Sequence, residues 1–180
     1  MGAGLFLPID FNTTGVGVGV SVDARFRIPL GRLFAVSFGA RGIYEHEGCS
    51  GAAISQDFVC VDAGPSRTMG GFSADLYSIH ATAALELTFG RFMSSYLILA
   101  PGMLRGAVSE TGGWVTAGRP ANTDVASFAL IGALGYEFLI GRVRPFFEWG
   151  YRYVPDVHDG SGHTVLSGYL AGTVGVRAAF

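Results

Sequence analysis

The segment from residue 15 to residue 28, GVGVGVSVDARFRI, alternates without a break between two kinds of side chain. Its even positions, from Val16 to Ile28, are all apolar, and its odd positions, from Gly15 to Arg27, are all small or polar. A period of two residues places the two kinds on opposite faces of a β-strand and does not fit a helix. A strand of 14 residues, tilted by about 45°, rises roughly 34 Å, about the height of a bilayer core. Strands in soluble sheets are mostly nearer to about 5–6 residues.

The same alternation recurs along the chain and predicts seven strands in all. They cover residues 15–28, 33–46, 76–89, 95–108, 127–139, 143–153 and 166–180. The segment 95–108 has the weakest pattern, because Leu97, Leu99 and Met103 suggest apolar side chains on both of its faces. The length of 180 residues fits one domain. We therefore expect a single all-β domain.

Three copies of one five-residue phrase connect these strands in pairs. They are LGRLF at 30–34, FGRFM at 89–93 and IGRVR at 140–144. Each contains a glycine, which supplies the backbone freedom of a tight turn. The other connections are long and polar, at 47–75, 109–126 and 154–165. Short turns at one end and long loops at the other are typical of bacterial outer-membrane barrels, so the turns are predicted to be periplasmic and the loops extracellular.

The composition supports a membrane location without a membrane helix. No stretch approaches 18 uninterrupted apolar residues, so no transmembrane helix is predicted. The chain is 49% hydrophobic and 14% charged, which is too little charge to solvate the outer wall of a soluble barrel. Its net charge of −2 offers no basic field for nucleic acid. An even number of strands is expected, and residues 2–9 are the only candidate for the eighth.

Aromatic residues are predicted to form two girdles where the barrel meets the lipid headgroups. Those near the short turns are Phe26, Phe34, Phe89, Tyr96, Tyr136, Phe138 and Phe180, and those near the long loops are Tyr44, Trp149, Tyr151 and Tyr153.

Charged residues occupy the polar rows, which are predicted to face the interior. They are Asp23, Arg25, Arg27, Arg41, Glu45, Glu86, Arg105, Glu137, Arg144, Glu148, Arg152 and Arg177. An eight-stranded barrel is just wide enough for side chains to fill, and unpaired charge there is costly. Pairing of arginine with carboxylate is therefore expected. We interpret the set as a structural plug of salt bridges, with an ion path or gate as the alternative.

The chain as a whole resembles the small eight-stranded outer-membrane barrels of Gram-negative bacteria, of the outer membrane protein A and X type. The most specific element is its end, GTVGVRAAF, where Phe180 closes an alternating strand. This is similar to the C-terminal signal that the barrel assembly machinery reads. The resemblance implies an eight-stranded antiparallel up-and-down barrel in the bacterial outer membrane. It also implies contact with outer-membrane lipid and lipopolysaccharide, a monomer, and no cofactor.

The connection 47–75 is the longest and contains both cysteines, Cys49 and Cys60. Their spacing is poor for zinc and no pair of histidines accompanies them, so a disulfide in an oxidising compartment is the better interpretation. A ring closed by this bond would stiffen an exposed loop. The loop is therefore a candidate site for an extracellular ligand.

Three functions remain open from the sequence: a structural or surface-interaction barrel, a narrow channel, and a membrane-embedded enzyme of the lipid A hydrolase or transferase kind found among relatives. An esterase needs a nucleophile, a base and an orienting acid within reach. No Ser–His pair is found on the predicted lipid face, because His80 is expected inside and the other histidines, His46, His158 and His163, in loops. We expect no catalytic residues, no metal site, and a surface or structural role.

Overall fold

The computed structural model describes residues 2–9, 16–54, 60–62, 70–112, 122–155, 157–158, 164–166 and 168–179. The elements are β1 (Gly2–Ile9), β2 (Val16–Pro29), β3 (Phe34–Ile54), β4 (Cys60–Asp62), β5 (Gly70–Phe89), β6 (Met93–Gly112), β7 (Asn122–Phe138), β8 (Val143–Tyr153), β9 (Val157–His158), β10 (Thr164–Leu166) and β11 (Tyr169–Ala178). Among these residues, no helix is long and apolar enough to cross a membrane.

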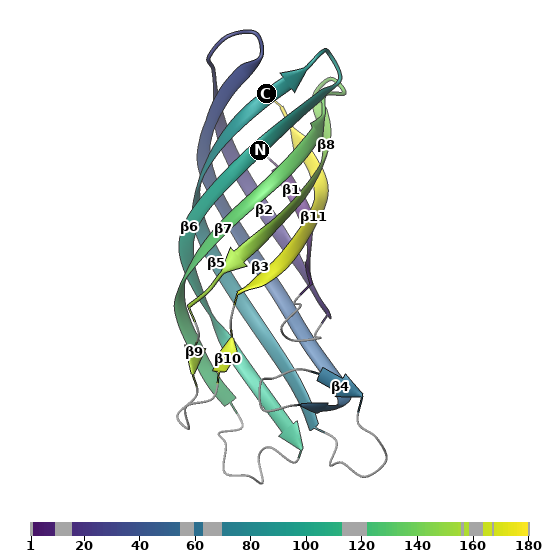
Figure 1. Ribbon diagram of the computed structural model, residues 1–180, viewed down its shortest axis with the longest axis vertical. Helices are drawn as coiled ribbons and strands as arrows, with labels where there is room; N and C mark the ends of the chain where they lie inside the picture. The colour runs from purple at the N-terminus through teal and green to yellow at the C-terminus, as the bar shows by residue number, and fades with distance from the viewer. Residues whose placement is uncertain are drawn as a thin grey trace.

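Seven antiparallel up-and-down strands curl through 234° into an open half-barrel (Figure 1). Each pairs with the next in the order β2, β3, β5, β6, β7, β8 and β11. The short strand β1 pairs with β11 on one side and with β2 on the other. The all-β prediction and the order of the strands are confirmed.

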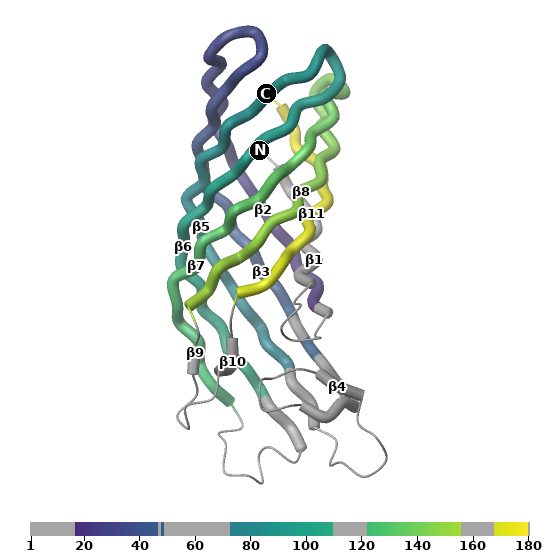
Figure 2. The backbone as a smooth tube through the Cα atoms, in the orientation of Figure 1, coloured from purple at the N-terminus to yellow at the C-terminus, as the bar shows by residue number. Residues whose placement is uncertain are grey.

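The three GR phrases form tight turns at one end of the sheet, here called the turn end (Figure 2). Their glycines have positive φ angles, 145° at Gly31, 63° at Gly90 and 62° at Gly141. Side chains with a Cβ rarely adopt such angles, which explains why glycine recurs at these three positions. The opposite end, called the loop end, carries the longer connections.

Four strands run further toward the loop end than the alternation predicted. The pairing of β3 with β5 continues to Ala52 opposite Gly70, and that of β5 with β6 continues to Gly70 opposite Gly112. These outer segments are rich in Gly, Ser and Ala, so they carry no apolar period, and the hydrogen-bond ladder with the neighbouring strand extends them instead. The predicted loop 47–75 is therefore largely a continuation of the sheet. Its remaining residues, 55–59 and 63–69, lie outside the described residues.

The two faces of the sheet have opposite chemistry. The convex face exposes large apolar side chains on all seven long strands, among them Val22, Phe38, Ile79, Leu97, Leu134, Phe147 and Val176. The concave face buries charged and polar side chains, among them Asp23, Arg41, Glu45, Glu148, Arg152 and Arg177. This is the reverse of a soluble protein, in which apolar side chains are buried and charged ones are exposed.

Strand β6 corrects two predictions made from the pattern. Arg105 is exposed on the convex face, in the same row as Leu97 and Met103, so its predicted place inside is wrong. Tyr96 lies in the other row with Leu104 and is 2% exposed, so it does not belong to the turn-side girdle. The inward row of β6 includes Leu104 and Val108, which belong to a buried apolar cluster. Both faces of this strand are therefore apolar, and hydropathy does not distinguish the inner face from the outer one.

Candidate functional site: a buried arginine–carboxylate network

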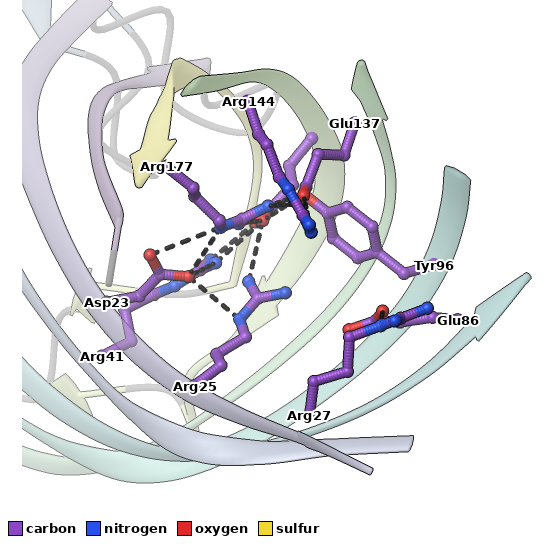
Figure 3. Close-up of polar contacts among 10 residues, drawn as sticks. Asp23, Arg25, Arg27, Arg41, Glu86, Tyr96, Glu137, Arg144 and Arg177 are labelled. Atoms are coloured by element: carbon purple, nitrogen blue, oxygen red, sulfur yellow. Dashed lines mark hydrogen bonds and ion pairs between the residues drawn. The ribbon is translucent and has the colours of Figure 1, made fainter. Parts of the chain in front are cut away.

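The carboxylate of Glu148 on β8 is the common acceptor of a buried network on the concave face. Figure 3 labels the side chains that surround it, among them Arg25, Arg41 and Arg177. Both of its oxygens accept from Arg41 on β3, at 2.7 and 2.8 Å. Its Oε2 also accepts from Arg25 Nη2 at 3.1 Å, from Arg177 Nη2 at 2.7 Å and from the Tyr96 hydroxyl at 2.8 Å. Glu148 is 2% exposed, so these donors take the place of water around the charge.

Arg177 on β11 connects this acceptor to two further carboxylates. Its Nε donates to Asp23 Oδ2 at 3.2 Å, and its Nη1 donates to Glu137 Oε2 at 3.0 Å and to the Tyr96 hydroxyl at 2.9 Å. Its guanidinium carbon also lies 3.8 Å from the centroid of the Phe146 ring. The five guanidinium N–H groups of arginine form a planar fork, which suits one side chain to several acceptors at once.

Asp23 on β2 and Glu137 on β7 complete the set. Asp23 forms ion pairs with Arg25 at 2.9 Å and Arg41 at 3.5 Å, and Glu137 accepts from Arg144 at 3.2 Å. We call this set the Glu148 network: Asp23, Arg25, Arg41, Tyr96, Glu137, Arg144, Glu148 and Arg177. It joins strands β2, β3, β6, β7, β8 and β11 across the concave face.

A second group, the Glu45 cluster, consists of Glu45, Arg152 and Tyr169. The Tyr169 hydroxyl donates to Glu45 Oε1 at 2.6 Å, Arg152 Nη1 donates to that hydroxyl at 2.5 Å, and Arg152 also forms an ion pair with Glu45. All three side chains are at most 1% exposed. Between this cluster and the Glu148 network lies a cavity of about 10 Å³, about the minimum that holds one water molecule.

A larger cavity of about 400 Å³ lies at the turn end, between the network and the Arg27–Glu86 ion pair. Its charged lining consists of Asp23, Arg25, Arg27, Glu86, Glu137, Arg144 and Arg177. The Arg27 Nε donates to Glu86 Oε2 at 2.6 Å, and the Arg27 side chain is 43% exposed. Buried Arg177 therefore belongs both to the lining of this cavity and to the network.

Toward the loop end the concave face changes from charged to apolar. The residues of this apolar cluster are Ala74, Leu76, Leu104, Val108, Val125, Ala129 and Val154, and none is more than 2% exposed. They come from β5, β6, β7 and the residue after β8. The concave face therefore differs in polarity between the turn end and the loop end.

All predicted interior charges except Arg105 lie on the concave side or at its turn-end mouth. Tyr96 and Tyr169, which the alternation of the sequence did not assign to the interior, are the neutral members of the two groups. A glycine on the neighbouring strand is the signal that could have placed Tyr96 inside. Tyr96 on β6 stands opposite Gly135 on β7, and Gly135 stands opposite Glu148 on β8. The ring lies over Gly135, where a Cβ would collide with it, and so the hydroxyl reaches Glu148 two strands away.

Histidines take up two contrasting places. His80 is buried, its Nδ1 lies 3.1 Å from the Ala100 carbonyl oxygen, and it forms no contact with Glu86, which pairs with Arg27. His46, which was expected in a loop, lies on β3 with its side chain 48% exposed, and its Nδ1 lies 2.9 Å from Asp75 Oδ1 on β5. Neither has a serine or cysteine hydrogen-bond partner among the described side chains.

The cysteine register does not favour the predicted disulfide. Cys60 on β4 stands opposite Ile54, whereas Cys49 on β3 stands opposite Phe72 of β5. The five residue steps from Cys49 to Ile54 span roughly 17 Å of strand, and a disulfide needs Cα atoms within about 7 Å. No disulfide is seen in the described part of the chain, and the two cysteine side chains lie outside it. Phe180, the predicted assembly signal, also lies outside the described residues.

Comparison of the chain with known protein families and with curated proteins found no match.

Proposed function

We propose that this chain is a closed eight-stranded barrel of the bacterial outer membrane, with an interior that conducts nothing and a structural or surface-interaction role. The observation that carries the proposal is the inverted distribution of polarity. Large apolar side chains such as Ile79 (73% exposed) and Phe26 (71% exposed) cover the convex face, while Glu148 and Arg41 are buried inside. Lipid, rather than water, is the solvent that stabilises this arrangement.

Strand β1 supports closure into a barrel. It pairs with β11 over residues 2–9 and with β2 from Gly2 opposite Asp23 to Ile9 opposite Val16. Added to the seven strands of the half-barrel, it gives an even number of strands and leaves no edge between β2 and β11. A membrane requires this, because an unpaired edge exposes backbone N–H and C=O groups to hydrocarbon.

The loop end is proposed as the extracellular side, and the region 47–75 as the surface that meets an outside ligand. In the outer membrane the convex face would contact lipid and lipopolysaccharide, and the chain would be inserted by the barrel assembly machinery as a monomer. Labelling of thiols in unreduced protein tests the loop separately. Two reactive thiols would agree with the register of Cys49 and Cys60, and none would mean that this hairpin rearranges to form the disulfide.

Conductance across a planar bilayer tests the proposed closed interior. Protein folded into the bilayer, with insertion shown by a heat-dependent shift in gel mobility, should give no discrete openings. Reproducible openings would contradict a closed interior. Heat-independent mobility would instead contradict the barrel itself.

A narrow channel is the second candidate, and the 400 Å³ cavity at the turn end favours it. Its lining includes four arginines and three carboxylates, which would favour the entry of small ions. For this cavity to conduct, the Glu148 network and the apolar cluster would both have to open. If the chain is a narrow channel, the unaltered protein should show openings in a bilayer, and Glu148→Gln, which removes the shared carboxylate of the network, should change their conductance.

An enzymatic role is not part of this proposal. His46 and Asp75 form the histidine–carboxylate half of a hydrolytic triad, but no nucleophile joins them among the described side chains. Hydrolysis of a chromogenic ester by the folded protein would overturn this part of the proposal, and a His46→Ala variant would show whether this histidine is responsible.

A further inference from the structure

Each of the three turn phrases contains an arginine directly after its glycine: Arg32, Arg91 and Arg142. The positive φ angles of the turns explain the glycines, but no turn geometry requires arginine at the next position. All three arginine side chains are exposed. The repeated arginine therefore needs an explanation of its own.

The three arginines are distributed along the turn end, one in each turn. They lie in the turns β2–β3, β5–β6 and β7–β8 at the same end of the sheet (Figure 1). Neighbouring turns are joined by backbone hydrogen bonds, from Thr88 N–H to the Leu33 carbonyl and from Leu139 N–H to the Phe92 carbonyl. The chain end closes the remaining gap, where the Ala179 N–H donates to the Arg142 carbonyl at 2.8 Å. We call Arg32, Arg91 and Arg142 the turn arginines.

Exposed apolar side chains accompany every turn arginine. They are Leu30 (62%), Leu33 (56%), Phe89 (47%), Phe92 (77%), Ile140 (65%) and Val143 (55%). If the chain spans a membrane, these apolar side chains are in contact with lipid. The turns then lie at the boundary between the hydrocarbon and the headgroups. An arginine at this depth extends its apolar stem along the lipid and its guanidinium toward the phosphate layer.

No carboxylate in the described part of the chain shares this outer surface with the turn arginines. The carboxylates at the turn end, Asp23, Glu86 and Glu137, lie on the concave side and are paired with other arginines. None of the turn arginines forms an ion pair within the described residues. The convex face carries the half-exposed Asp75 and the exposed Asp124, and both lie near the loop end instead.

We propose that the turn arginines bind the phosphate groups of anionic glycerophospholipids in the leaflet that meets the turns. This inference rests on the proposed membrane-spanning barrel. Guanidinium groups bind phosphate oxygens through paired N–H donors, which suits them to this headgroup. Each basic side chain near an anionic lipid surface contributes about fivefold in affinity, so each turn arginine predicts a preference of about fivefold for an anionic lipid at its own turn.

Native mass spectrometry of the protein, released from micelles with equal amounts of phosphatidylglycerol and phosphatidylcholine, measures this preference. The unaltered protein should retain mainly phosphatidylglycerol, and a triple Arg→Gln variant at 32, 91 and 142 should retain the two lipids almost equally. Arg105→Gln is the matched control, because it removes one exposed arginine from the other end of the same face. It should keep nearly the full preference.

Single replacement of Arg91 by Gln should lower the number of preferentially retained phosphatidylglycerol molecules by about one, and this variant provides the test if the triple variant does not fold. Retention of the preference in the triple variant, or an equal loss in Arg105→Gln, would overturn the proposal. Folding is followed separately by the heat-dependent gel shift in phosphatidylcholine vesicles. Absence of that shift in the unaltered protein would contradict the barrel itself and not the lipid site.

Discussion

The two halves of the concave face are built on the same strands but by different chemistry. Toward the turns, Glu148 is held by three arginines and a tyrosine, and a 400 Å³ cavity remains beside the network. Toward the loops, Leu76, Leu104 and their neighbours pack without exposure. A charged interior must match every charge with a partner of fixed geometry and leaves space where the partners do not reach, whereas apolar side chains can fill the space between strands.

This difference predicts how each half responds to mutation. The turn-side half should be sensitive to loss of a single charge, because one carboxylate serves several strands. The loop-side half should be sensitive to loss of volume. The outer wall, whose side chains meet solvent or lipid, should be less sensitive to both.

The largest effect is expected from Glu148→Gln. The change leaves Arg25, Arg41 and Arg177 without their shared carboxylate in a buried site, which costs about 3–5 kcal/mol of unfolding free energy. Urea unfolding of the protein in lipid vesicles, followed by tryptophan fluorescence, measures the loss. Glu86→Gln is the control, because its ion pair with Arg27 is partly exposed and contributes less than about 1 kcal/mol. Equal losses in the two variants would show that the Glu148 network does not hold the strands together.

Leu104→Ala tests the loop-side half. Removing a fully buried side chain should lower the unfolding free energy by about 2–5 kcal/mol, through lost transfer energy and the cavity left behind. Met103→Ala is the control, because Met103 is the next residue on the same strand and is 59% exposed on the opposite face. The same urea titration should show a loss for Met103→Ala that is less than half as large. A reversed order would mean that β6 presents its faces the other way round.

Gly135→Ala tests how the tyrosine joins the charged half. The new methyl group would occupy the space of the Tyr96 ring, and such overpacking costs about 1–3 kcal/mol. Gly132→Ala, three residues earlier on β7, has open space at the corresponding position and should change the stability little. In a Tyr96→Phe background the hydrogen bond from Tyr96 to Glu148 is already absent. Gly135→Ala should then lower the unfolding free energy only by the cost of the steric clash. A cost at Gly132 equal to that at Gly135 would contradict the assigned faces of β7.

The smallest effect is expected outside both halves, at Asp75 on the convex face. Tyr77 stands opposite Tyr44, which belongs to the predicted loop-side girdle, and Asp75 lies two residues further toward the loop end. Asp75 is therefore outside the proposed membrane-spanning segment. Hydrogen bonds from His46 and Tyr44 lower the pKa of its carboxyl below the usual value. A lowered pKa in the folded state adds stability above the ordinary carboxyl pKa, and this is lost as the pH falls below it.

Asp75→Asn should therefore remove a small acid-sensitive part of the stability, within about 1 kcal/mol because the site is half-exposed. Urea midpoints of the two proteins, measured from neutral to acidic pH, should converge as the pH falls. Midpoints that stay apart in acid would show that this carboxylate does not account for the difference.

The sequence by itself determined the alternating parts of the strands, their two faces except on β6, and the turns between them. In the segment from Val16 to Ile28, neighbouring residues alternate between apolar and polar. In a strand, neighbouring side chains point to opposite faces, so this local pattern assigns each side chain to the inner or the outer face. The glycines of the GR phrases are an equally local signal, because whether a residue tolerates a positive φ angle depends mainly on its own side chain. For this reason Asp23, Glu148 and Arg177 could be assigned to the concave side without coordinates.

Only the tertiary structure decided which charges meet. Arg41 and Glu148 are 107 residues apart, and Arg177 and Asp23 are 154 apart. Their contacts depend on the register of each strand against the next, and no period in the sequence specifies that register across the whole sheet. The same holds for Tyr96, which reaches Glu148 only because Gly135 stands between them, and for Arg105, whose strand is apolar on both faces. Pattern alone assigns a side chain to a face, and the accumulated register of the strands assigns it a partner.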